Sequence, residues 1–377
     1  MAGADAGYPS RDTECNRPRR VADPQEVPVS LNFGLFFPFR NPPKWHIPWH
    51  EFYESQLAQA ELAEQLGYDE IWLSEHHFCE DGWSPSLFTI AGALSQRTKK
   101  IRIGTDMLLL PLGKHPVQVA EDAATVDIMS NGRFDLGLAL GYRVPEFKGF
   151  GIPRDERAGR MDEALEIIYR AWTEESFSFS GKYYQLENVT LVPKPIQQPH
   201  PPLWVAAMSK RAAARAARFN CHVAGTGGEN LQRYFDEALQ KEGKNPDDFG
   251  VSQLRLVYVA PTRDQAWDDA QHHAHYMMSA YDKWLKEAAD VAWFQETMSV
   301  SSMPAPEQLR HTKDLSFFEA PLIVGTPDDA IAEIERYQRE SRVTHLVMWM
   351  QLAGMDPKKA ESCMKLFAEE VMPHFRR

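Results

Sequence analysis

Short apolar strands alternate with amphipathic helices along almost the whole chain, and this alternation constrains the fold more than any other feature. The apolar segments are LNFGLFF, DEIWLSE, IRIGTDMLLLP, GRFDLGLAL, PPLWVAA, CHVAGT, SQLRLVYVA, PLIVG and HLVMWM. Helical patterns follow at 50–66, 86–97, 116–129, 155–172, 210–218, 230–241, from about 263, at 327–340 and at 357–371. This spacing predicts a parallel sheet with right-handed crossovers. About eight strand–helix units, with no glycine fingerprint after the first strand, favour a closed (β/α)8 TIM barrel with insertions over an open doubly wound sheet.

Two segments fall outside the alternation. Residues 1–28 mix Arg, Pro, Asp and Gly without periodicity, and we expect a flexible N-terminal arm. Residues 29–377 then form a single barrel domain. Within it, the aromatic and turn-rich run FSFSGKYYQLENVTLVPKP predicts a small hairpin, and an irregular segment at about 290–320 is expected to be a mobile lid over the site.

Charge and composition limit the class of partner. The formal net charge of −12 makes a surface that repels phosphate backbones, so we expect no nucleic acid. No apolar run approaches the ~18 residues of a membrane span, and the N-terminus lacks the apolar core of a signal peptide. The four cysteines, Cys15, Cys79, Cys221 and Cys363, are widely spaced and predict reduced thiols in a cytoplasmic protein.

Functional residues of a TIM barrel lie at the C-terminal ends of its strands. This rule selects residues 37–40, 75–78, 106–108, 139–143, 207–209, 225–228, 259–261 and 349–351. Many of these residues are apolar or aromatic, and the adjacent histidines of the EHHF motif fall within the set.

Glu75, His76 and His77 directly follow the second strand pattern. A metal site needs several converging ligands, but adjacent side chains of a strand point to opposite faces, and no ligand motif supports them elsewhere. The pattern instead favours a general acid/base at the barrel mouth, with Glu75 orienting a neighbouring imidazole. A hydrogen-bonded packing role stays open, especially for His77.

Three further patterns are less specific. His272, His273 and His275 share a helix with Asp268 and Asp269, and a solvated polar face explains them. The glycine-rich turn at 225–228 is either a tight strand–helix turn or a cradle for a phosphate. Ser209 is a predicted helix N-cap, and the same helix start could also hold a phosphate.

Several motifs together resemble a known family. They are FGLFF…NPP, GYDEIWLSEHHF, IRIGTDMLLLPLGKHPVQVAEDAATVDIMSNGRF, GFGIPRDERAGRMDEALEII, PPLWVAAMSKRAAARAARF and LFAEEVMP. In this order they resemble the bacterial luciferase-like flavin-dependent monooxygenases, over nearly all of residues 31–373. The resemblance implies a (β/α)8 barrel, reduced FMN (FMNH2) supplied by a separate NAD(P)H-dependent flavin reductase, and dioxygen as co-substrate. The implied chemistry is oxygen transfer to an organic substrate through a flavin 4a-hydroperoxide.

The resemblance also assigns roles to individual positions. His76 matches the family's catalytic histidine, and His77 its supporting neighbour. Asp106 and Met107 match a non-proline cis peptide beneath the isoalloxazine ring. The positions where the luciferase catalytic subunit holds the flavin phosphate are Met208, Ser209 and Ala212.

Departures from the luciferase pattern alter two of these expectations. Ala139 and Leu140 stand where the luciferase subunit has a reactive cysteine and a phosphate-contacting arginine, and Met208 and Ala212 replace a Glu and a Thr. We therefore do not expect light emission. Other residues must therefore bind the flavin phosphate. The candidates are Arg143, Lys210, Arg211 and the turn that contains Gly227 and Gly228.

The leading hypothesis is an FMNH2-dependent monooxygenase of a two-component system that acts on a small hydrophobic substrate. Apolar residues expected near the mouth support such a substrate: Phe36, Phe37, Trp45, Trp83, Met107, Trp349 and Met350. The alternatives are a deazaflavin-dependent hydride-transfer oxidoreductase and a non-catalytic flavin-binding accessory subunit, which would not need both histidines. Family members pair through helices near the first strands, so we expect a homodimer or a higher homo-oligomer.

Overall fold

Eight parallel strands close into a ring in the computed structural model, which describes residues 31–225, 229–288, 303–312, 316–317 and 320–376. In ring order they are β1 (Asn32–Phe37), β2 (Glu70–Leu73), β3 (Arg102–Thr105), β5 (Phe134–Ala139), β8 (Leu203–Ala206), β9 (His222–Gly225), β10 (Val251–Val259) and β14 (His345–Trp349). The ring closes because β14 pairs with both β1 and β10. The predicted (β/α)8 barrel is confirmed.

One predicted strand is not part of the ring. The segment PLIVG contains β13 (Ile323–Gly325), which pairs with the last residues of β10, with Ile323 opposite Val257. A second short strand, β4 (Leu108–Leu109), continues beyond β3 and pairs with β5. The alternation of the sequence therefore contains one more strand than the barrel uses.

Helices surround the ring, and their bounds follow the predicted ones within a few residues. They are α1 (Trp49–Gln65), α2 (Leu87–Arg97), α3 (Pro116–Ser130), α5 (Arg157–Thr173), α6 (Lys210–Arg218), α7 (Glu229–Lys241), α8 (Arg263–Glu287), α10 (Pro327–Glu340) and α11 (Pro357–Leu366). The predicted last helix is divided, because a π-helical turn at Phe367–Val371 separates α11 from α12 (Met372–Phe375). The sequence did not predict α4 (Val144–Phe150), a short helix with Pro145 in its first turn and Gly151 as its C-cap.

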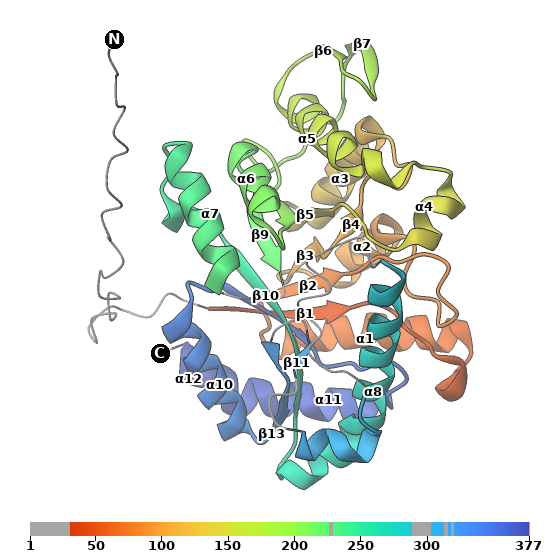
Figure 1. Ribbon diagram of the computed structural model, residues 1–377, viewed down its shortest axis with the longest axis vertical. Coiled ribbons are helices and arrows are strands. Elements are labelled where there is room, and N and C mark those ends of the chain that lie inside the picture. Colours follow the sequence, from red (N-terminus) through yellow and green to blue (C-terminus); the bar gives the residue numbers. More distant parts are fainter. Residues whose placement is uncertain (1–30, 226–228, 289–302, 313–315, 318–319, 377) are drawn as a thin grey trace, which may run out of the picture.

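The insertions are partly as predicted. The hairpin is present as β6 (Phe177–Ser180) and β7 (Gln185–Val189), beside α5 in Figure 1. The predicted arm at 1–28 lies outside the described residues, as does most of the predicted lid at 290–320. The described part of that segment is not wholly irregular, since it contains a 3-10 helix (Pro306–His311) and the short strands β11 (Ser316–Phe317) and β12 (Ala320–Pro321). Across the described ranges, no helix combines the length and apolarity that a membrane crossing requires.

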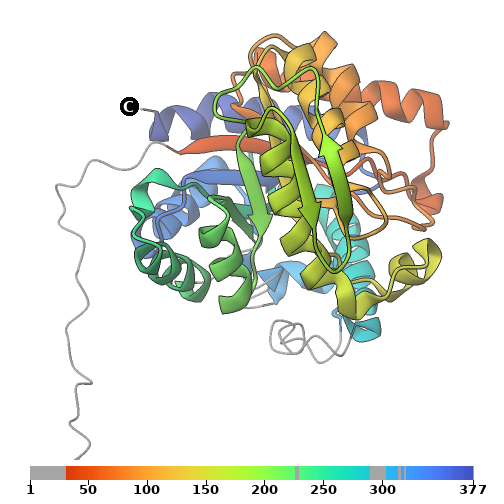
Figure 2. The same cartoon turned by 90° about the horizontal axis from the view of Figure 1, so that it is seen from above.

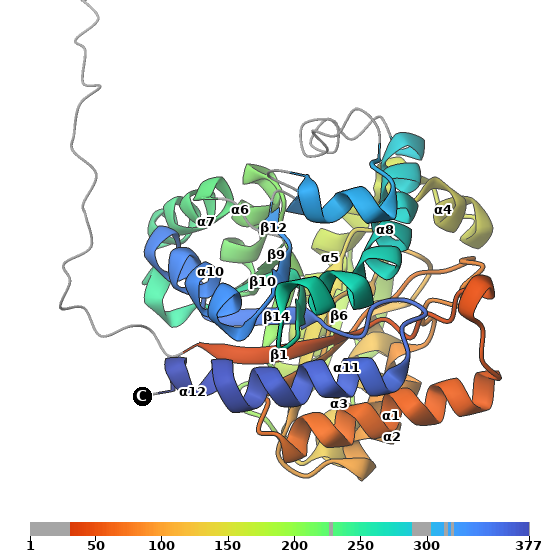
Figure 3. The ribbon, with the colours of Figure 1, turned by 90° about the horizontal axis from the view of Figure 1, so that it is seen from below.

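Tryptophans fill the barrel interior near its N-terminal end. Trp72 is buried and lies across Gly34 and Gly104, where an added Cβ would stand 2.8 Å and 2.4 Å from the indole. Trp204 meets Trp72 edge to face at 5.4 Å. Only glycine leaves room for the indole at these two strand positions. The last helix covers the same end, because α12 lies beside the start of β1 (Figure 3) and the rings of Phe33 and Phe375 are 6.0 Å apart.

Candidate active site

The predicted site residues gather at the C-terminal end of the barrel, which we call the mouth. His76 and His77 follow β2, Asp106 and Met107 follow β3, and Met208 and Ser209 follow β8. Both histidines are buried, with 5% and 8% of their surfaces exposed. The peptide bond between Asp106 and Met107 is cis, as the resemblance implies.

His76 is held by a carboxylate that the sequence did not reveal. Its Nδ1 lies 2.8 Å from Oε1 of Glu146, and the His77 backbone N–H donates to the same oxygen at 2.9 Å. Glu146 is fully buried on α4, and Arg143, the N-cap residue of that helix, also donates to Oε1 at 3.2 Å. Burial alone would raise the pKa of Glu146, but His76, the His77 N–H and Arg143 outweigh it and hold the pKa below its ordinary value.

This pairing fixes the proton on the imidazole. An ionised carboxylate only accepts hydrogen bonds, so Nδ1 of His76 carries the hydrogen and Nε2 is left to exchange a proton with another group. The sequence did not predict a role for Glu146, because this residue lies on the unpredicted helix α4, 70 residues after His76. The only local signal was an acid three residues after Arg143, just beyond a strand end.

His77 belongs to a separate cluster. Its Nε2 lies 2.6 Å from Oε1 of Glu75, which also pairs with Lys114, and the Leu109 N–H donates to Oε2 at 2.9 Å. Burial would raise the pKa of Glu75, but His77 and Lys114 outweigh it and lower the pKa. The expectation that Glu75 orients a neighbouring imidazole is confirmed for His77. The two histidines face different carboxylates, and in the described ranges no group of three or more His, Cys, Asp and Glu could hold a metal ion.

Aromatic rings enclose His76. Its imidazole centroid lies 4.6 Å from Trp83, 5.1 Å from Trp284 and 5.6 Å from Tyr142. Trp284 comes from α8, which lies beside α4 in Figures 2 and 3. The sequence predicted α8 but gave no sign that its later turns reach the mouth. These rings and the neighbouring polar groups leave only 5% of the His76 surface exposed.

The residues expected to support the apolar mouth are distributed over two places. Trp349 lies 5.6 Å from Trp83 and 4.9 Å from Phe36, so these three extend the wall of the enclosure. Trp45 instead packs on His273 at 4.6 Å and lines a separate cavity of about 520 Å³. His272 is exposed as predicted, but His273 is half-buried and its Nδ1 donates to the Ala353 carbonyl.

Asp106 and Met107, joined by the cis peptide bond, lie at the mouth directly after β3. Met107 is 7% exposed and crosses Gly137, where an added Cβ would lie 2.6 Å from its sulfur. Burial raises the pKa of the neighbouring Asp106 to about 7, so its carboxyl can donate a hydrogen bond near neutral pH. In the described part of the chain, Nε of Arg143 and Oε2 of Glu146 are buried without hydrogen-bond partners. These groups could meet the polar edge of a planar ring system.

The predicted phosphate-side residues belong to different elements of the mouth. Ser209 is the N-cap of α6 as predicted, and its Oγ accepts from the Ala212 N–H at 3.3 Å. Arg143 lies in the His76 cluster, where it donates to the His77 carbonyl at 2.8 Å and stacks 4.2 Å from the Trp284 ring. Gly227 and Gly228 lie outside the described residues.

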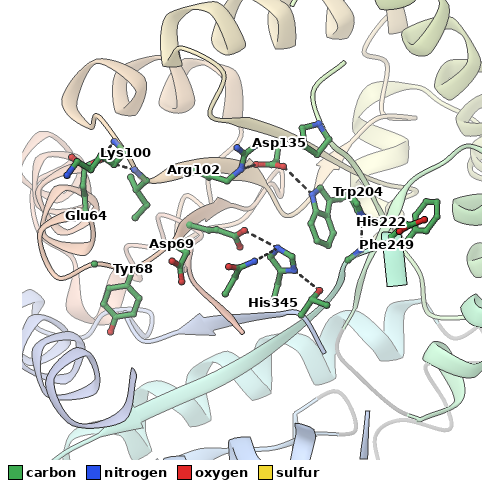
Figure 4. Close-up of a pocket in the computed structure, with 18 of the residues that line it drawn as sticks. Glu64, Tyr68, Asp69, Lys100, Arg102, Asp135, Trp204, His222, Phe249 and His345 are labelled. Atoms are coloured by element: carbon green, nitrogen blue, oxygen red, sulfur yellow. Dashed lines mark hydrogen bonds and ion pairs between the residues drawn. The ribbon is translucent and has the colours of Figure 1, made fainter. Parts of the chain in front are cut away.

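A cavity of about 660 Å³ lies at the opposite end, among the N-terminal ends of the strands, which we call the base. Figure 4 shows His345 near its centre, where it pairs with Glu70 at 3.2 Å and Asn32 at 3.0 Å. Asp135 pairs with Arg102 at 2.7 Å on the same wall. The larger cavity is thus at the other end of the barrel from His76.

Comparisons with known proteins show which family the chain resembles. Residues 31–345 match the family model described as luciferase-like monooxygenase. The oxygenase component of flavin-dependent trigonelline monooxygenase from Acinetobacter baylyi is 25% identical, over 86% of this chain and 90% of that protein. An F420-dependent glucose-6-phosphate dehydrogenase from Microbacterium testaceum is 28% identical, over 84% and 91%. A monooxygenase structure from Streptomyces bottropensis has a TM-score of 0.76 at 25% identity, over 92% of this chain and all of that one.

Proposed function

The chain belongs to the luciferase-like monooxygenase family, and on that premise we propose that it is the FMNH2-dependent oxygenase of a two-component system. It would use dioxygen to oxygenate a hydrophobic organic substrate. The observation that carries the proposal is the His76–Glu146 pair, a buried imidazole with one nitrogen fixed by a carboxylate and the ring enclosed by aromatic side chains.

The residues of the mouth have separate tasks in this proposal. When bound, reduced flavin supplies the electrons that activate dioxygen. Nε2 of His76 exchanges a proton with the reacting oxygen atoms or the substrate, while Glu146 keeps the proton on Nδ1. The rings of Trp83 and Trp284 exclude water from the reaction. His77, through Glu75 and Lys114, keeps the loop after β2 in place.

The cofactor would lie over Asp106 and Met107. Its phosphate would reach the start of α6, near Met208 and Ser209, and the turn with Gly227 and Gly228. Arg143 would meet the flavin from the histidine side. The resemblance and the positions of these residues in the barrel support the assignments.

Partners follow from the same premise. A protein named as an oxygenase component, such as the trigonelline relative, works with a second component, and we propose an NAD(P)H-dependent flavin reductase here. We also propose a cytoplasmic homodimer. Ile128 and Met129 on α3 are apolar and exposed by 37% and 42%, which suits pairing through this helix.

Rapid mixing tests the proposal. The protein is loaded with photoreduced FMN without oxygen and then mixed with oxygenated buffer while absorbance is recorded. We expect tight binding of reduced FMN and an oxygen-dependent transient that precedes oxidised FMN and decays faster when a substrate is added. Immediate reoxidation at the rate of free FMNH2 would contradict an oxygenase.

The second candidate is a hydride-transfer enzyme that uses the deazaflavin F420. The observation that favours it is the similarity to proteins named as F420-dependent dehydrogenases, over most of both chains. Parallel titrations with F420 and FMN separate the two. Selective binding of F420, with reduction by an added alcohol or sugar phosphate, would replace the monooxygenase proposal.

A further inference from the structure

A buried arginine that the catalytic proposal does not use lies at the end of β1. Arg40 is 3% exposed, and its Nε donates to Oδ2 of Asp81 at 2.7 Å. The Tyr276 hydroxyl donates to the same oxygen at 3.1 Å. Within the described residues, Nη1 of Arg40 and Oδ1 of Asp81 are buried and have no hydrogen-bond partner. The guanidinium is therefore paired on one side only.

Four aromatic rings surround this cation. The guanidinium carbon lies 4.5 Å from the Trp83 centroid and 5.2 Å from that of Tyr276, and 5.9 Å from both Trp284 and Trp349. Such contacts stabilise a positive charge through the ring faces. Trp83 and Trp284 are also neighbours of His76. A fixed positive charge thus stands in the wall of the enclosure, one indole away from the imidazole.

The chemistry of the Arg40 guanidinium indicates which class of ligand it can bind. A guanidinium carries five N–H donors in a planar fork that matches a carboxylate, and a buried donor without a partner is costly unless a ligand supplies one. The aromatic cage already contains a cation, so a second cation would be repelled. An oxyanion would satisfy Nη1, and a flat apolar body next to it would pack against the indoles.

We propose that Arg40 binds the carboxylate of the substrate, so that the substrate is an apolar, ring-bearing carboxylic acid. This inference rests on the proposed function, and it narrows the expected hydrophobic substrate to one with an acidic group at one end. The carboxylate on Arg40 would orient the rest of the molecule towards His76. Because Arg40 is 3% exposed, surrounding side chains have to move before a ligand can reach Nη1.

Benzoate and benzamide, which have similar shapes and differ in charge, test the assignment. Calorimetric titrations use the full chain, with and without oxidised FMN, and need neither reduction nor oxygen. We expect benzoate to bind at least about tenfold more tightly than benzamide, in line with a charge-assisted bidentate pair. Arg40→Gln should abolish this preference. Arg102→Gln, which removes an arginine paired with Asp135 at the base, should keep it.

Two further variants keep the test decisive if Arg40→Gln does not fold. Arg40→Lys retains the charge without the planar fork and should show an intermediate preference. Asp81→Asn removes the competing carboxylate and should strengthen benzoate binding. Equal binding of the two probes by the parent, binding of neither, or an unchanged preference in the Arg40 variants would overturn the assignment. Since no reduced flavin is involved, such a failure is distinguishable from failure of the proposed oxygenase activity.

Discussion

The mouth and the base of the barrel each hold a histidine against a buried carboxylate, but they differ in how completely their polar atoms are paired. At the base, His345 contacts Glu70, Asn32 and Thr344, and Trp204 donates to Asp135. At the mouth, His76 contacts Glu146 in a similar way. Inspection of the histidine–carboxylate pairs alone would not distinguish the two ends.

Buried polar atoms without hydrogen-bond partners distinguish the mouth from the base. Among the described residues, such atoms occur at the mouth in Arg40, Asp81, Arg143 and Glu146, and none belongs to a residue that lines the base cavity. Native proteins rarely leave buried polar groups unpaired, and where they do, a ligand or water usually supplies the partner. This difference supports a ligand-binding role for the mouth and a structural role for the base, although the base holds a cavity of about 660 Å³. This agrees with the general division of labour in TIM barrels.

The largest expected contrast comes from the two histidines. His76→Ala should lower turnover by roughly 10²–10⁴, the scale of a lost general acid/base. His345→Ala should leave turnover near that of the parent but lower the free energy of unfolding by about 2–4 kcal/mol, because it leaves Glu70 buried without this partner. Substrate-dependent oxygen uptake and urea unfolding measure the two effects. Similar turnover in His76→Ala and the parent would remove His76 from the mechanism.

A smaller effect is expected from the carboxylates. Glu146→Gln should reduce turnover by roughly 10–100-fold, because Gln no longer fixes the proton on Nδ1 of His76, and should alter the pH profile of turnover. Since the pKa of Glu146 is lowered on folding, its contribution to stability is present above the ordinary value of 4.5 and is lost as the pH falls through the folded pKa. The stability deficit of Glu146→Gln should therefore be full at neutral pH and shrink in acid.

Glu70→Gln is the matched variant at the base. It weakens the bonds of Glu70 to Trp72 and His345, so the free energy of unfolding should fall while the pH profile of turnover stays that of the parent. A changed pH profile of turnover in Glu70→Gln would mean that the base is coupled to the chemistry at the mouth.

The sequence predicted the fold better than the site. Alternation was enough for the barrel, and the strand-end rule was enough to bring His76 and Asp106 to one mouth. Glu146 and Trp284 were missed because each reaches His76 through tertiary packing of distant elements, α4 and α8, whose local patterns carry no sign of it. The extra strand β13 was counted because its composition is the same as that of a ring strand, and only pairing distinguishes the two.

The mouth and the base each contain a buried aspartate with a raised pKa, Asp106 and Asp135. Burial raises the pKa of Asp106 to about 7 and that of Asp135 to about 6, and Arg102 opposes the second shift. The folded state then binds a proton that the unfolded chain releases near 3.8, so stability falls as the pH rises from 3.8 through the folded pKa.

Asp106→Asn should remove this penalty and raise the free energy of unfolding at pH 8 by about 1–3 kcal/mol, with no gain at pH 4. Asp135→Asn should destabilise the protein even at pH 8, because Asn keeps a single acceptor oxygen and cannot accept from both Arg102 and Trp204. Unfolding curves at both pH values measure this. A stabilised Asp135→Asn would show that the base is not fully paired.

The smallest expected effects concern two helix caps, one at each end. Ser209 caps α6 at the mouth through the Ala212 N–H, and Asn245 caps the 3-10 helix Pro246–Asp248 at the base through the Asp247 N–H. Replacing either residue by Ala should cost about 0.5–1 kcal/mol of stability. Only Ser209→Ala should also weaken the binding of FMN more than the binding of riboflavin, since a hydroxyl at a helix start can bind phosphate. If Ser209→Ala weakens both ligands equally, Ser209 is a cap and nothing more, and the phosphate must be held by other residues of the mouth.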